Sequence, residues 1–168
     1  MSGSNGFIDA PQIPQAAAPG DIVGLNLQNT GATATPIQPL IFGEVFKPGA
    51  VAPDQGLVMS VGGASLPVQM DAKTFNADGS VAMAVLTVMA PALPGNSTEG
   101  AMLALAPAAP PSPPVNLASA LHNYSLVVDL SGTDSAGHSG SEKVNAVAAM
   151  QKALAKGTAT YWQQGPLA

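Results

Sequence analysis

The sequence predicts a mainly β fold, a small β-barrel or sandwich with an extended N-terminal arm and one C-terminal helix. Leu57, Met59 and Val61 fall on one face of a segment that has the two-residue period of a strand. Residues 76–80, NADGS, predict a tight reversal, because Gly79 tolerates the positive φ that such a turn requires. Turn signals recur about every 8 to 12 residues, which is typical of an all-β domain.

Strand character recurs along the first three quarters of the chain, and each strand-like segment is bounded by Gly, Pro, Asn or Asp. The segments are Ile22–Gln28, Leu57–Gly62, Leu66–Asp71, Val81–Met89, Met102–Ala106 and Leu126–Leu130. Consecutive strands separated by such short turns favour antiparallel pairing around one core.

Three regions are expected. Residues 1–20 form a Pro- and Gly-rich arm, residues 21–130 form the β-barrel domain, and residues 131–168 form a polar loop, a helix and an aromatic C-terminal segment. The Pro-rich connector 107–114 lies within the barrel region, and consecutive prolines favour an extended geometry that cannot join a sheet interior. We expect this connector to deliver the strand at Leu126–Leu130 to the far side of the barrel.

The C-terminal region predicts one helix. Ser139 and Glu142 have the spacing of a capping box, which places the start of the helix in this segment. Gly157 follows the last turn as a C-cap, and residues 158–162 resemble the start of another strand. One face of the helix carries Val144, Val147, Met150 and Leu154.

The composition favours a packed subunit over a freely diffusing enzyme. Only 9% of the residues are charged, against about 25% in an average soluble protein, and the net charge is −5. A weakly charged surface is weakly repelled by its neighbours and is easily buried against them. All five basic residues are Lys, which disfavours a nucleic-acid partner because no Arg is available for bidentate phosphate contacts.

The sequence also predicts no membrane partner, since no apolar run approaches the roughly 20 residues of a membrane helix. The first residues, MSGSNGFIDAPQ, have neither the basic nor the apolar region of a secretory signal, so synthesis in the cytoplasm is expected. Cysteine is absent, which excludes disulfides and thiolate metal sites.

No motif predicts an enzyme. The segment Gly137–Ser141 superficially matches a nucleophile elbow but has Ser where the pattern requires its second Gly. Asp129, Asp134 and His138 could be drawn together around a cation, but acidic residues in a Gly- and Ser-rich loop usually bind the turn backbone. Neither a catalytic residue, a metal nor a cofactor is therefore expected.

Two pairs of side chains are candidate partner-binding residues. Phe7 and Ile8 are large apolar residues near the start of the arm, and they either belong to a mobile terminus or dock on a neighbouring subunit. Tyr161 and Trp162 are costly to expose, so they either cover the core or anchor a partner.

Three stretches resemble a known family: residues 42–49 (FGEVFKPG), residues 66–71 (LPVQMD), and residues 78–86, which begin DGSV and end AVL. They are similar to the RIFT-barrel-like N-terminal domain of the exo-rhamnogalacturonan lyase (YetA-like) family, and similar domains occur in tail and fibre-type proteins of bacteriophages. The resemblance covers about residues 36–106 and implies that "FG" lies at a tight bend of a strand. It carries over no catalytic residue, because catalysis in these lyases belongs to a later domain. Ala82 and Met83 stand where relatives tend to have a basic residue, which weakens the case for a sugar or anion contact there.

The resemblance and the composition together lead to one functional expectation. The chain is expected to be a structural virion protein of a tailed bacteriophage, located in the tail, at a fibre attachment or on the capsid surface. It would act through protein–protein packing, with other virion proteins and copies of itself as partners. The alternative is a non-catalytic carbohydrate-binding or accessory module, related to polysaccharide lyases, that binds a surface glycan.

Overall fold

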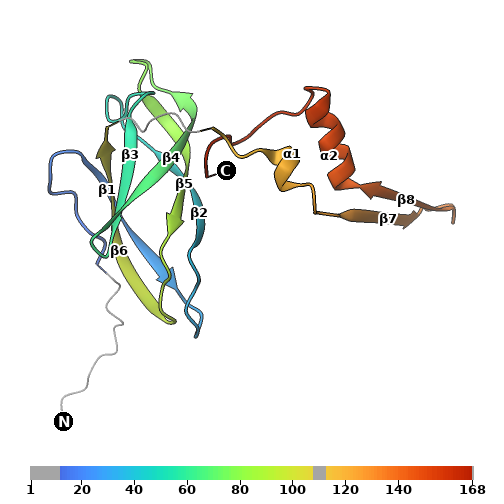
Figure 1. Ribbon diagram of the computed structural model, residues 1–168, viewed down its shortest axis with the longest axis horizontal. Coiled ribbons are helices and arrows are strands. Elements are labelled where there is room, and N and C mark those ends of the chain that lie inside the picture. Colours follow the sequence, from blue (N-terminus) through green and yellow to red (C-terminus); the bar gives the residue numbers. More distant parts are fainter. Residues whose placement is uncertain (1–11, 108–112, 168) are drawn as a thin grey trace, which may run out of the picture. The chain divides into compact units, whose positions relative to one another are not determined.

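The computed structural model describes residues 12–107 and 113–167 and has a mainly β architecture, as the sequence predicts (Figure 1). The described chain divides into two compact units. The first contains residues 12–107 together with residues 165–167, and the second contains residues 113–164. The chain therefore leaves the first unit after its last strand and returns to it at the C-terminal segment.

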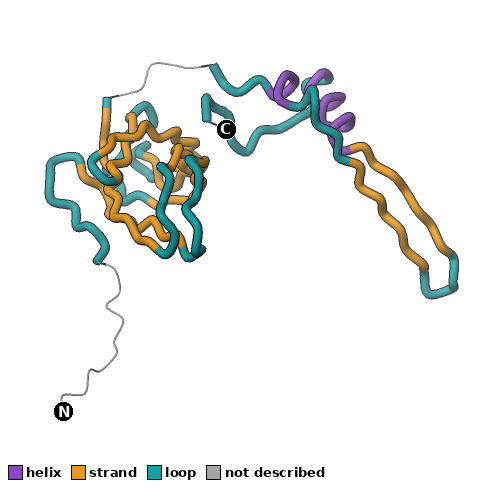
Figure 2. The backbone as a smooth tube through the Cα atoms, turned by 60° about the horizontal axis from the view of Figure 1, so that its bottom comes forward, coloured by secondary structure: helices purple, strands orange, loops and turns teal. Residues whose placement is uncertain are grey.

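The first unit is a six-stranded antiparallel sheet that curls into a half-barrel (Figures 1 and 2). The order of the strands across the sheet is β1-β6-β3-β4-β5-β2, so β1 and β2 are the two edge strands. The strands are β1 (Asp21–Asn29), β2 (Gln38–Val45), β3 (Gly56–Val61), β4 (Ala64–Phe75), β5 (Val81–Ala90) and β6 (Ser97–Ala106).

The strand pattern read from the sequence is confirmed in this unit. Leu57, Met59 and Val61 of β3 are all buried. The predicted reversal joins β4 to β5: Gly79 has φ +82° and donates its N–H to the carbonyl of Asn76 at 3.0 Å. The "FG" bend is wrong, however, because Phe42 and Gly43 pair in unbroken register along the middle of β2.

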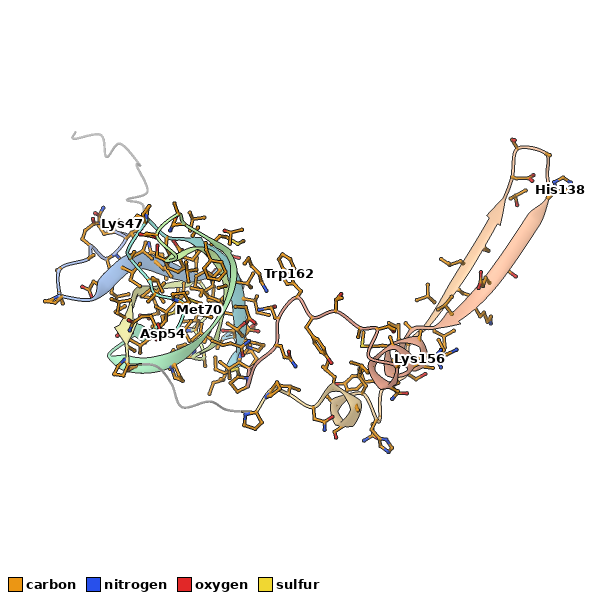
Figure 3. All side chains as sticks on the ribbon, turned by 90° about the horizontal axis from the view of Figure 1, so that it is seen from above. Lys47, Asp54, Met70, His138, Lys156 and Trp162 are labelled. Atoms are coloured by element: carbon orange, nitrogen blue, oxygen red, sulfur yellow. The ribbon has the colours of Figure 1, made fainter. Side chains whose placement is uncertain are left out.

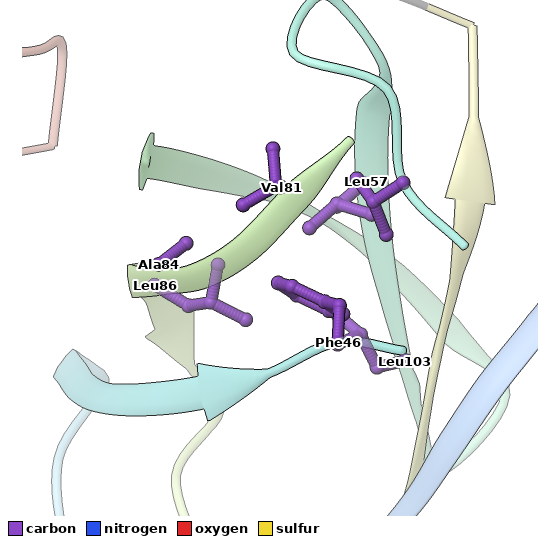
Figure 4. Packing of buried hydrophobic residues seen from close by; sticks show 7 residues of the cluster. Phe46, Leu57, Val81, Ala84, Leu86 and Leu103 are labelled. Atoms are coloured by element: carbon purple, nitrogen blue, oxygen red, sulfur yellow. The ribbon is translucent and has the colours of Figure 1, made fainter. Parts of the chain in front are cut away.

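The interior of the half-barrel is filled by two neighbouring apolar clusters, to which β5 contributes on its inner face. The first cluster contains Phe46, Val51, Leu57, Val81, Ala84, Leu86 and Leu103 (Figure 4). The second contains Leu27, Met59, Val61, Val88, Leu93 and Ala101. Most of these side chains come from alternate strand positions, while Phe46, Val51 and Leu93 come from the connecting loops. Phe42 and Val68 pack against both clusters and join them into one interior layer.

The outer face of β5 is buried around Thr87, which has no exposed surface, whereas Met89 farther along the same face is 38% exposed. Gln69 of β4 lies opposite Thr87 in the register. The C-terminal segment docks here, because the N–H of Leu167 donates to Oε1 of Gln69 at 2.9 Å while Nε2 of Gln69 donates to Asp71 at 2.7 Å. Gly165 is buried against the same Gln69 side chain. The returning segment therefore covers the outside of the sheet where β4 and β5 meet.

The segment 12–20 also packs on the first unit and is not a free arm over that length. Pro14 crosses β1 at Gly24, where a Cβ atom would overlap the Pro14 carbonyl. The carboxylate of Asp21 accepts two hydrogen bonds from backbone N–H groups of the segment, at 2.9 and 2.8 Å. Glycine at position 24 is therefore required by the close approach of two backbones.

The second unit consists of two short helices and a hairpin (Figure 2). Its elements are α1 (Leu117–Ala120), β7 (Val127–Thr133), β8 (Ser139–Asn145) and α2 (Ala146–Ala155). β7 and β8 pair antiparallel over their full length, from Val127 opposite Asn145 to Thr133 opposite Ser139. The helix predicted in this part of the chain forms, but only its last three turns do so.

Two expectations about this region were wrong. The strand predicted at Leu126–Leu130 forms, but it pairs with β8 and not with the barrel. The barrel region consequently ends before residue 113, earlier than the expected boundary at residue 130. Residues 158–162 form no strand.

The predicted capping box was also wrong, because Ser139 and Glu142 belong to β8. The N-cap of α2 is Asn145, whose side-chain oxygen accepts from the N–H of Ala148 at 2.9 Å. Asn is as good an N-cap as Ser, and it stands directly before the helix-favouring residues. The C-terminal end is as predicted, since Gly157 has φ +65° and donates to Leu154.

Replacing Leu103 of β6 should destabilise the half-barrel strongly. This side chain is fully buried, so Leu103→Ala removes packed methyl groups and leaves a cavity, at a cost of about 2–5 kcal/mol in the free energy of unfolding. Leu105 on the same strand is 37% exposed, and Leu105→Ala should cost less than half as much. Urea unfolding followed by circular dichroism measures both values, and equal losses would contradict this arrangement of the strand.

The substitution Gly24→Ala should detach the segment 12–20. The added methyl group overlaps the backbone of Pro14, which has no room to yield while it remains on the sheet. Amide hydrogen exchange within residues 12–20 is expected to become faster. The matched control is Gly43→Ala, where the nearest atom is the flexible methyl of Met83 at 3.7 Å, and exchange in the segment should not change.

Candidate assembly surfaces

The side chains that could carry chemistry do not form a reactive site. The described residues contain no group of three His, Cys, Asp or Glu side chains placed to hold a metal ion. Asp134 and His138 meet at the hairpin turn, with Oδ2 and Nδ1 2.9 Å apart, but Asp129 is 3.2 Å from Nζ of Lys143 instead. The three residues considered from the sequence are therefore split between a hydrogen-bonded Asp134–His138 contact and the Asp129–Lys143 ion pair.

The segment Gly137–Ser141 lies in the hairpin turn and in β8, and not between a strand and a helix as a nucleophile elbow does. The hydroxyl of Ser139 is 2.8 Å from that of Thr133, while the ring of His138 binds Asp134. Figure 3 shows His138 at the turn of the hairpin, at the end away from α2. These contacts hold the turn together and do not align a nucleophile with a base.

Asp134 organises that turn. Its carboxylate accepts hydrogen bonds from the N–H groups of Ala136 and His138, both at 2.9 Å, in addition to its contact with the His138 ring. The His138 side chain, followed by these backbone donors, lowers the pKa of Asp134. The charged carboxylate is therefore the form that closes the turn.

The hairpin has one polar and one apolar face. Strand alternation places Leu126, Val128 and Leu130 on the same face, and Val144 lies directly across from Val128. Leu126 extends the ladder beyond β7, because its carbonyl accepts the N–H of Ala146 at 2.9 Å. We call these four side chains the hairpin face. The opposite face carries Val127, the Asp129–Lys143 pair and hydroxyl groups.

The hairpin face is uncovered in the described structure. Leu126 and Leu130 are 56% and 57% exposed, and Val128 is 38% exposed. Every residue of β7 is exposed, and none of the described residues of the second unit is buried. This part of the chain therefore has no core of its own, although its alternation pattern is that of a half-buried strand.

The residues singled out from the sequence have different outcomes. Phe7 and Ile8 lie outside the described residues. Tyr161 and Trp162 are 49% and 67% exposed, so these two side chains do not fill a core. The question whether they anchor a partner stays a prediction. The hairpin face was missed, because the alternation at Leu126–Leu130 was assigned to the barrel.

The half-barrel is open between its edge strands β1 and β2, which form no ladder with each other. Two hollows of about 290 and 450 Å³ lie along this gap, at opposite ends of the two strands. The larger one is lined mostly by apolar side chains, among them Ile22, Val23 and Phe46. Burial raises the pKa of Glu44, which also borders it.

Comparison with protein-family models, with curated proteins and with solved structures found no match for this chain. No helix among the described residues is long and apolar enough to cross a membrane.

The carboxyl group of Asp134 should titrate below an ordinary Asp. Because its folded-state pKa is lowered, its contribution to the stability of the turn is present above the ordinary Asp pKa and is lost as the pH falls through the lowered value. A carboxyl-carbon NMR titration measures this pKa. In His138→Ala the largest cause is removed, so the pKa should rise toward the ordinary value; an unchanged pKa in that variant would contradict the assigned contact.

Proposed function

We propose that this chain is a structural virion protein of a tailed bacteriophage, in the tail, at a fibre attachment or on the capsid surface. It acts by packing against other virion proteins and copies of itself, and not by catalysis. The observation that carries the proposal is the hairpin face, an apolar surface on a unit in which none of the described residues is buried.

The hairpin of β7 and β8 needs support from outside its own two strands. A two-stranded hairpin is at best marginally stable in water and requires a third strand or a packed apolar face for support. Covering apolar surface contributes about 25 cal/mol per Å², so a neighbour placed on Leu126, Val128 and Leu130 stabilises both the contact and the hairpin. A subunit that is completed by its neighbour suits an assembly better than a free protein.

The charge distribution supports the same function. With only 9% charged residues and a net charge of −5, neighbouring copies repel each other weakly. Within the hairpin, Asp129 and Lys143 neutralise each other on the polar face. The hairpin face itself carries one charged neighbour, Glu142, opposite Leu130.

The bacteriophage setting rests on the resemblance of residues 42–49, 66–71 and 78–86 to domains found in phage tail and fibre-type proteins. Those domains are β-barrels, and the first unit of this chain is a curled antiparallel sheet. The resemblance lies within the first unit, whereas the hairpin face lies in the second. The two units thus supply separate support for the proposal.

A carbohydrate-binding accessory module is the second candidate. The observation in its favour is that the second unit exposes three aromatic side chains, Tyr124, Tyr161 and Trp162. Aromatic rings offer a large rigid surface with a polar edge, which suits the face of a sugar ring.

Density-gradient sedimentation of the native source, with mass spectrometry of each fraction, tests the proposed function. Co-migration with a large particle is expected, and recovery only as a small free species would contradict it and make glycan-array screening the next experiment.

Leu130→Asp places a charge on the hairpin face and should reduce incorporation of the chain into the particle. Ser131→Asp adds the same charge to the opposite face and is the matched control.

A further inference from the structure

We propose that two copies of this chain pair through the outer edges of their β7 strands, antiparallel and related by a two-fold axis, to form a four-stranded sheet. The inference deepens the proposed function, on which it rests, by naming a second copy of this chain as one partner and by giving the register in which the two β7 edges pair. Among the described residues, β7 forms a ladder only with β8, so its other edge has unpaired N–H and C=O groups.

The β7 edge has few of the devices that normally protect an edge strand, and its one charged residue, Asp129, is 3.2 Å from Nζ of Lys143. Its sequence, VVDLSGT, contains no Pro and no Lys, and its register with β8 has no bulge. An exposed edge without such protection is a template for pairing with another strand. A two-fold axis uses the same edge of both copies, so one unprotected strand is sufficient for a closed pair.

The apolar residues favour β7 over β8 as the shared edge. β7 and the residue before it supply Leu126, Val128 and Leu130 to the hairpin face, whereas β8 supplies only Val144. Pairing through β7 therefore joins six large apolar side chains into one continuous patch. Pairing through β8 would put the two β7 strands at the opposite edges of the four-stranded sheet, so that their apolar side chains would be separated by the two β8 strands.

Charge decides between the registers that keep both apolar faces on the same side. A register centred on Val128 puts Val128 opposite its counterpart, Leu126 opposite Leu130, and Val127 opposite Asp129 of the other copy. No like charges meet, and each Asp129 keeps its own Lys143. A register centred on Asp129 would oppose two carboxylates, which destabilises a cross-strand pair.

A register centred on Leu130 avoids that repulsion but uses the apolar face less well. It places Val128 opposite Gly132 and Leu126 opposite the charged Asp134 of the second copy. The pairing centred on Val128 thus matches the largest number of apolar side chains. Directly opposite residues in an antiparallel pair have Cα atoms about 4.5–5.5 Å apart, which is within the range of a disulfide.

Single-cysteine variants test this register directly, because the chain contains no cysteine. Under mild oxidation, Val128→Cys should shift from 16.6 kDa to a covalent dimer of twice that mass. Val127→Cys is the control at the adjacent position. In this register the Cα atoms of residue 127 in the two copies lie farther apart than the roughly 7 Å limit for a disulfide. An equimolar mixture of Leu126→Cys and Leu130→Cys chains should cross-link, although neither variant does so alone.

Cross-linking of Val128→Cys no faster than of Val127→Cys would overturn the pairing. Sedimentation of the unmodified chain provides a second measurement that needs no oxidation: a dimer is expected, dissociated by Leu130→Asp and retained in Ser131→Asp. A strictly monomeric chain at high concentration would also overturn it. If the chain co-migrates with a particle but Val128→Cys does not cross-link, the proposed assembly function stands and the β7 pairing is wrong. If Val128→Cys cross-links but the chain does not co-migrate with a particle, the β7 pairing stands and the proposed function is wrong.

Discussion

The burial of β5 on both faces is the constraint on which the rest of the fold depends. Its inner face packs into both apolar clusters through Leu86 and Val88. Its outer face holds Thr87, which has no exposed surface. A strand buried on two sides needs two covers, and only one of them is the barrel interior. The second cover lies on the outer face, where the C-terminal segment binds Gln69. The chain returns to the sheet there after residues 113–164, which form the second unit.

The same constraint explains how much of the first unit could be predicted from its sequence. Strand period, turn residues and burial all agree between β3 and β5, so local patterns were sufficient to place Leu57 and Met59 inside and Gly79 in the turn. The alternation pattern does not show which strand pairs with which, because the register between distant segments is set by the whole sheet. The docking of Leu167 on Gln69, 98 residues apart, has no local signal.

In the second unit, local signals were ambiguous. Ser139 and Glu142 fit a capping box, but both residues lie in β8, and the N-cap of α2 is Asn145, six residues after Ser139. Leu126–Leu130 shows the alternation of a half-buried strand, which was attributed to the barrel. Alternation predicts that one face of a strand is covered, but it does not identify the segment or the partner that covers it.

The two units differ in what stabilises them, and this difference links folding to assembly. The half-barrel encloses two apolar clusters, whereas the described residues of the second unit have an apolar face but no buried side chain. A neighbour that covers Leu126, Val128 and Leu130 therefore contributes to the ordering of the hairpin as well as to the contact. Ordering the hairpin costs conformational entropy, which offsets part of the favourable free energy of such a contact. The affinity per unit of buried area is therefore lower than for a contact between two pre-formed surfaces. Single contacts of this kind are weak, so a subunit built in this way is held firmly only where several contacts act together in a larger particle.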